Sequence, residues 1–194
     1  MKKLLIAVVV FALPLLGHAD EFPAIERAIF GINLGETEKS LLRKCYDAGI
    51  VVDERPCIGR DHPGKVWAFK GTLNKNEEVR KTEASIFNGQ VYEVKVIFRD
   101  GSNDFYEGLR KKLASKYGKP TIVSAWWGKY RYKANFGGEP VYILVDRDCF
   151  LVEQTSIAYS YRRLADKVTR EMEARKAKRI AEADKKVKKV DADL

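Results

Sequence analysis

The chain has 194 residues and a formal net charge of +9, from 36 Lys and Arg against 27 Asp and Glu. Residues 161–194 contribute +5 (12 basic against 7 acidic residues), and Lys2 and Lys3 contribute another +2, so the rest of the chain is nearly neutral. This distribution argues against a generally basic, nucleic-acid-binding surface. The length accommodates one domain with its own core and a tail.

The first 19 residues have the three parts of a secretory signal peptide. A short basic start is followed by an apolar run over residues 4–16, and small residues at 17 and 19 precede Asp20. The run is shorter than the ~20 apolar residues of a spanning helix. We therefore expect cleavage after Ala19 and a periplasmic or secreted protein. No Cys lies at the cleavage site, so no lipid attachment is expected.

Three cysteines follow the expected cleavage site: Cys45, Cys57 and Cys149. An oxidising compartment permits disulfides, and an odd number leaves one thiol unpaired or paired between chains. The short separation favours a Cys45–Cys57 disulfide with Cys149 unpaired. Three separate buried thiols remain the alternative. The spacing contains no C-x-x-C motif of a redox or zinc site.

Helical patterns open the expected domain, residues 20–161. Apolar residues at helical spacing predict a short helix within residues 22–30. A second helix is predicted from the N-cap Thr37 to Gly49, which suits the left-handed conformation that ends helices. Its expected inward residues are Leu41, Leu42, Cys45 and Tyr46.

Strand patterns with period two follow at residues 66–69, 84–87 and 91–98. The last two flank Asn88-Gly89, a strong signal for a tight hairpin. The residues expected on one buried face of the third strand are Tyr92, Val94, Val96 and Phe98.

The second half of the domain repeats the order of helix and strands. Asp104 with Glu107 resembles a capping box, and Gly118 ends the predicted helix. Its apolar stripe is Phe105, Leu109, Leu113 and Tyr117. Strands are predicted at residues 121–127, 130–136 and 141–161, the last with a turn at 146–148. The fold class is therefore α+β, with helices packed on one face of a mainly antiparallel sheet.

A charged C-terminal helical tail is predicted over residues 162–194. Acid-before-base pairs four residues apart support a helix. Its first apolar strip is Leu164, Val168 and Met172, and the strip thins to Ile180, Val187 and Val190. We expect the first half to dock on the domain and the second half to be solvated or to dock on a partner helix, as in a coiled coil.

Three stretches together resemble a known group of proteins. They are the Gly-Ile-x-Leu-Gly run at residues 31–35, the Asp100-Gly101 turn with the helix ending at residues 116–120, and the aromatic run over residues 126–132. The combination resembles small periplasmic α+β proteins of the β-lactamase-inhibitor-protein and SmpA/OmlA outer-membrane-assembly group. That resemblance implies a unit that binds other proteins and catalyses nothing.

Few residues in the sequence carry catalytic or metal chemistry. His62 is the one histidine after the expected cleavage site, and its Asp-His-Pro-Gly context predicts an exposed turn. Asp146 and Asp148 flank Arg147, which favours a strand-connecting turn over a cation site. We expect no catalytic residues, no metal and no cofactor.

Aromatic and basic residues give the remaining surface signal. The candidate binding residues are Trp127, Tyr130, Arg131 and Tyr132. Trp, Tyr and Arg are enriched at binding hot spots. Ordinary packing of the sheet is the alternative interpretation.

The sequence thus predicts an exported accessory, assembly or inhibitor protein that binds another envelope or secreted protein. One alternative is a hydrolase of cell-envelope material. Another is a protein that contacts anionic lipid or polymer through its basic tail. The oligomeric state stays open.

The expected export signal makes a direct prediction about the mature N-terminus. Mass spectrometry of the protein from cells should find Asp20 as the first residue, because the small residues at 17 and 19 suit signal peptidase. An intact Met1 in a cytoplasmic fraction would contradict this prediction.

Overall fold

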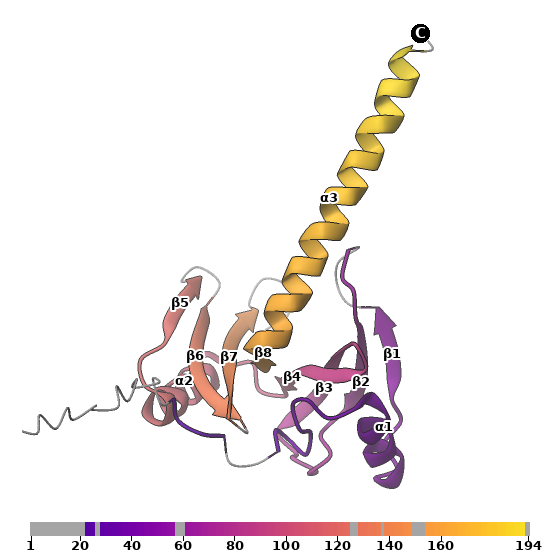
Figure 1. Cartoon of the computed structure of the whole chain (residues 1–194). Helices are drawn as coiled ribbons and strands as arrows, with labels where there is room; N and C mark the ends of the chain where they lie inside the picture. Colours follow the sequence, from indigo (N-terminus) through magenta and orange to yellow (C-terminus); the bar gives the residue numbers. More distant parts are fainter. Residues whose placement is uncertain are drawn as a thin grey trace, which may run out of the picture.

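A computed structural model describes residues 22–25, 28–56, 61–124, 128–136, 138–148 and 154–192. The described part contains an eight-stranded antiparallel sheet in the order β1-β2-β3-β4-β8-β7-β6-β5, together with helices (Figure 1). The fold is therefore α+β. The elements are α1 (Glu38–Asp47), β1 (Asp53–Pro56), β2 (Lys65–Lys70), β3 (Val79–Phe87), β4 (Gln90–Phe98), α2 (Asn103–Tyr117), β5 (Thr121–Ser124), β6 (Lys129–Phe136), β7 (Glu139–Asp148), β8 (Gln154–Tyr161) and α3 (Arg162–Ala192).

The sheet consists of two four-stranded halves. Strands β1 to β4 pair in sequence order, and so do β5 to β8. The halves meet where β4 pairs with β8, with Val94 opposite Tyr159 and Val96 opposite Ile157. These residues belong to one core that spans both halves of the sheet.

Helices α1 and α2 pack against the same apolar face of the sheet. Leu41 of α1 and Leu113 of α2 belong to the same hydrophobic core as Val96 of the central strand β4. Thr37 caps α1 as predicted, because its hydroxyl accepts the backbone N–H of Ser40 at 3.2 Å. The cap satisfies one of the N–H groups that the first helical turn leaves unbonded.

Helix α3 begins directly after β8 and contacts the opposite face of the sheet. Val168 forms a separate small core with Phe87 and Tyr92. Phe87 follows Ile86, whose side chain lies in the main core, so the strand alternation places Phe87 on the other face. The two helices within the domain, α1 and α2, thus contact one face of the sheet, and the C-terminal helix α3 contacts the other.

The N-terminal segment forms no helix in its described residues, so the helix predicted within residues 22–30 is wrong. Residues near Ala24 form a parallel bridge to Asn135, and Ile29 and Ile32 exchange hydrogen bonds of 2.8 and 2.9 Å around a tight turn. Ile29 is 4% exposed. Tertiary pairing with the sheet thus overrides the local helical spacing.

The Asn88-Gly89 hairpin is confirmed. Both residues have positive φ, 50° and 73°, as this tight turn requires. A register shift between Ser85 and Ile86 then separates Tyr92 from the face that it was predicted to share with Val94. The irregularity turns Tyr92 toward α3.

Two further boundaries differ from the sequence prediction. Ser102, rather than Asp104, caps α2, and its hydroxyl accepts the N–H of Phe105 at 3.2 Å. Residues 146–148 continue β7 and pair with β8 instead of forming a turn. None of the helices in the described ranges is long and apolar enough to span a bilayer.

A close backbone contact at Gly64 makes a prediction about stability. A Cβ at Gly64 would lie 2.2 Å from the carbonyl oxygen of Ile86. Gly64→Ala should therefore reduce the free energy of unfolding by about 2 kcal/mol, as overpacking does. Gly108→Ala is the control, because nothing lies within 4 Å of its Cβ position in α2. That change should stabilise the protein by roughly 0.5–1 kcal/mol in urea unfolding. Equal stabilities for the two variants would contradict the prediction.

Candidate functional site

Two predicted binding residues, Tyr130 and Tyr132, pack toward α2. Tyr132 is 1% exposed, and its hydroxyl donates a hydrogen bond to the backbone oxygen of Arg110 at 3.2 Å. The guanidinium of Arg110 lies 3.7 Å from the ring centre of Tyr130. The structure therefore gives Tyr132 a packing role, which is the alternative that the sequence left open.

Arg131 lies on the other face of β6. Its guanidinium is 4.9 Å from the ring centre of Tyr142, and the guanidinium of Arg162 is 5.8 Å from the same ring. Two cations thus share one aromatic ring on the face from which α3 rises. Trp127, the remaining predicted binding residue, lies outside the described residues.

The charge of the domain is concentrated in one segment. Residues 108–138, the second half of α2 with β5, β6 and their connections, contain eight Lys and Arg and no Asp or Glu. We call this segment the basic lobe. Near neutrality of the domain as a whole concealed it, because the compensating acidic residues lie elsewhere in the chain. The cations are Arg110, Lys111, Lys112, Lys116, Lys119, Lys129, Arg131 and Lys133.

Most of the lobe's cations have no carboxylate partner among the described residues. Arg110 pairs with Glu107 at 2.8 Å, and Lys129 pairs with Asp146 at 2.9 Å. For the other six cations the described part of the chain supplies no ion pair: Lys111, Lys112, Lys116, Lys119, Arg131 and Lys133. Uncompensated charge of one sign attracts ligands of the opposite sign.

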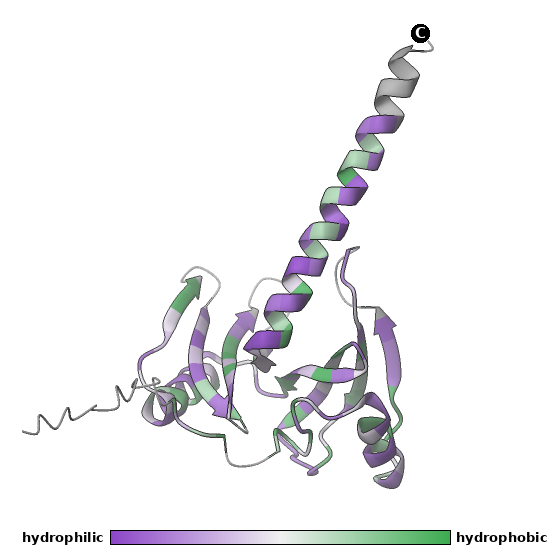
Figure 2. Ribbon diagram, viewed as in Figure 1, coloured by the Kyte–Doolittle hydropathy of each residue, from purple (hydrophilic) through white to green (hydrophobic). Residues whose placement is uncertain are grey.

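The edge strand of the basic lobe is apolar and exposed. Within the described sheet, β5 has a single neighbour, β6 (Figure 1). Ile122 is 62% exposed and Val123 is 45% exposed. Figure 2 shows the resulting hydrophobic stretch at the end of the sheet. An exposed apolar edge strand offers both backbone groups and side chains to another strand.

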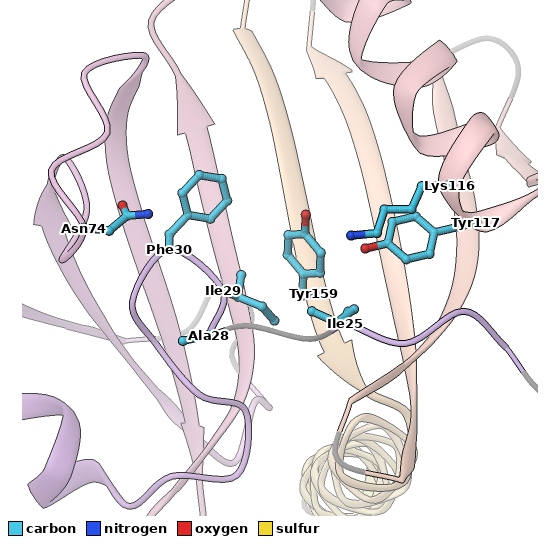
Figure 3. A pocket seen from close by; sticks show the side chains of 8 residues that line it. All are labelled: Ile25, Ala28, Ile29, Phe30, Asn74, Lys116, Tyr117 and Tyr159. Atoms are coloured by element: carbon cyan, nitrogen blue, oxygen red, sulfur yellow. The ribbon is translucent and has the colours of Figure 1, made fainter.

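A pocket of about 450 Å³ lies beside the lobe, between the N-terminal segment, β8 and the end of α2 (Figure 3). Ile25, Ile29 and Phe30 form its apolar side, and Lys116 with Tyr117 lines the opposite side. This volume is in the range of small-molecule sites.

Tyr159 lies in the middle of this pocket, between Phe30 and Tyr117 (Figure 3). Burial raises the pKa of the Tyr159 hydroxyl, so it stays neutral and can donate a hydrogen bond. The described residues that line the pocket therefore combine apolar walls with phenol hydroxyls and the ammonium of Lys116, a set that can hold a small amphipathic molecule.

His62 is half-buried, in contrast to the exposed turn residue predicted from sequence. Its Nδ1 accepts the backbone N–H of Gly64 at 3.0 Å, and its Nε2 lies 3.0 Å from the hydroxyl of Tyr92. An accepting Nδ1 places the proton of the neutral ring on Nε2, which then donates to Tyr92. Burial lowers the pKa of His62, and the charge of Arg175 on α3 lowers it further.

Cys45 is a free thiol in the structure and is 1% exposed. Burial raises the pKa of its thiol. The predicted Cys45–Cys57 disulfide is therefore not seen in the structure. Cys57 and the third cysteine, Cys149, lie outside the described residues. The described residues contain no group of three or more His, Cys, Asp or Glu that could hold a metal ion.

Comparisons with known proteins give no relative: no family model, no curated protein and no solved structure matches the chain.

The environment of His62 predicts a pH dependence of stability. Its folded-state pKa lies below the unfolded value near 6.5, so the folded state binds fewer protons in this range. Stability should be full above about pH 6.5 and decrease as the pH falls through the lowered pKa. His62→Gln should remove part of the difference between urea midpoints measured at about pH 7.5 and about pH 5.5. An unchanged difference in the variant would show that His62 does not cause it.

Proposed function

We propose that the protein is an exported, non-catalytic module that binds another protein, with α3 as the docking element. The observation that carries this proposal is the unequal burial of α3 along its 31 residues. Its first turns pack on the sheet, whereas all side chains from Glu173 to Lys185 are exposed. Figure 1 shows the helix leaving the domain and extending well beyond it.

The first turns of α3 are held on the sheet by apolar packing. Leu164, Val168 and Met172 pack against Phe87 and Tyr92. These contacts fix the direction in which the helix leaves the sheet.

Farther along α3, Arg179 donates from Nε and Nη2 to the carboxylate of Asp61, at 3.0 and 2.8 Å. This pair lies beyond the apolar contacts and is the last contact between α3 and the domain given by the described residues. It orients the rest of the helix without burying it.

The exposed part of α3 contributes little to the stability of the described domain. A polar helix without tertiary contacts is marginal in water, and each of its ion pairs adds only a few tenths of a kcal/mol. Ile180 is nevertheless 47% exposed on this stretch. Val187 and Val190, which the sequence places farther along the same strip, have side chains outside the described residues. We infer that a partner helix covers this strip.

The resemblance to the periplasmic inhibitor and assembly group leads to the same proposal, since that resemblance implies protein binding. A second candidate is contact with anionic lipid or polymer, which the excess of Lys and Arg in residues 161–194 favours. The two differ in their response to salt, because binding by charge alone weakens steeply as salt increases.

In-cell photo-crosslinking tests the proposal. A photoreactive residue at Ile180 should capture a defined protein partner, identified by mass spectrometry, and capture should persist at high salt because apolar contact is weakly screened. The matched control carries the same residue at Lys39, an exposed position on α1. Equal capture at both positions, or capture that high salt abolishes, would contradict docking through α3.

A chain truncated after Arg175 should lose that capture with little effect on the fold. Truncation removes the Arg179–Asp61 pair, whose Arg179 side chain is 46% exposed, and such pairs contribute about 0–1 kcal/mol. The melting temperature should therefore fall by a few degrees at most, as it should in Arg179→Gln. A much larger decrease in the truncated chain would make the distal helix part of the core.

A further inference from the structure

We propose that the exposed edge of β5 binds an extended acidic segment of a partner protein as an added strand of the sheet. This site is separate from α3 and does not depend on docking through that helix. It uses the free edge of the sheet for backbone pairing and the cations of the basic lobe for charge recognition.

The edge of β5 meets the first requirement, a strand open on one side. Residues Thr121 and Ile122 pair with Arg131 and Tyr130 of β6, and the described sheet ends there. Strand addition satisfies unpaired backbone groups, and alternate side chains of the incoming strand then contact both faces. The exposed Ile122 and Val123 supply the apolar contacts for such a strand.

Cations border this edge on both sides of the sheet. Lys111 and Lys112 are exposed on α2, which packs on the core face of β6. Arg131 pairs with Thr121 of β5 and, with the exposed Lys133, lies on the opposite face of β6. The Arg131 guanidinium is 4.9 Å from the ring centre of Tyr142, and the Lys133 ammonium is 5.3 Å from that of Phe22. Lys119 precedes β5. A strand added at β5 directs successive side chains toward alternate sides, so acidic residues on both of its faces meet positive charge.

The open edge of β5 and the cations around it favour one kind of ligand over the others. A second copy paired edge to edge would bring two basic lobes together, and like charges at an interface oppose binding. An anionic membrane meets one face of a molecule and makes no use of a backbone edge. An extended acidic segment satisfies the backbone edge, the apolar side chains and the cations on both faces together.

A short synthetic peptide of repeated Glu-Glu-Val-Val, the Glu–Val peptide, tests the proposal with the full chain, because it carries Glu and Val on both faces of an extended strand. The peptide should bind with an affinity that decreases as salt increases. Binding should slow amide hydrogen exchange at Thr121 to Val123, since added strand pairing protects edge amides. The same length of repeated Glu-Glu-Pro-Pro, the Glu–Pro peptide, keeps the charge but removes N–H donors from both edges of the strand, and it should bind at least about tenfold more weakly.

Two double substitutions distinguish recognition by the basic lobe from an effect of net charge. Lys119→Glu with Lys133→Glu should weaken the Glu–Val peptide by about tenfold or more. Lys39→Glu with Lys70→Glu makes the same change in net charge outside the lobe and should have less than about a twofold effect. All four side chains are exposed and have no ion pair among the described residues. Lys133 also lies 5.3 Å from the ring centre of Phe22, a contact worth about 0.5–1 kcal/mol at an exposed site, so the melting temperatures of both variants accompany the binding measurements.

Three results would overturn the proposal. The Glu–Pro peptide could bind as well as the Glu–Val peptide, which would make the lobe a general anion site. The two lysine pairs could have equal effects. Vesicles containing phosphatidylglycerol could bind with the same dependence on Lys119 and Lys133 while neither peptide protects β5, which would make the lobe a lipid-binding surface. Failure of α3 crosslinking would leave these measurements unaffected.

Discussion

The pairing of β4 with β8 is the contact on which the rest of the structure depends. Each half of the sheet is a run of neighbouring antiparallel strands, and in the strand order of the described sheet the halves meet at this pair. Val96 and Ile157 meet there at the centre of the shared core. Because α3 follows β8 without a connecting loop, the same pairing sets where the helix starts and which face of the sheet it leaves.

The two proposed surfaces are placed so that one partner does not displace the other. Helix α3 starts at the middle of the sheet, whereas β5 forms one edge, and β7 and β6 lie between them. The two also differ in chemistry. The free part of α3 offers a helical side-chain strip, and β5 offers a backbone edge bordered by unpaired cations. The strands between them hold the two proposed surfaces apart within one sheet.

Local signals were readable from sequence, and features set by distant contacts were not. The Thr37 cap and the Asn88-Gly89 hairpin depend on neighbouring residues, and both are as predicted. The N-terminal segment has helical spacing but pairs with Asn135, which no local pattern reveals. The sequence predicts that Tyr132 is a binding residue at the surface, whereas β6 directs its side chain into the core. The eight cations of the basic lobe can be counted in the sequence, but the near neutrality of the whole domain concealed them. The position of β5 at the sheet edge follows only from the strand order.

The place of β8 near the end of the strand sequence has a consequence for how the chain is made. The ribosome synthesises β1 to β4 first. Val94 and Val96 of β4 can pair with Tyr159 and Ile157 of β8 only after the second half of the sheet has been synthesised. Contacts this distant in sequence slow folding, because the intervening chain must be ordered before they form. Until β8 is synthesised, the apolar strand β4 lacks its partner on that side. Exposed apolar surface of this kind makes folding intermediates prone to aggregation.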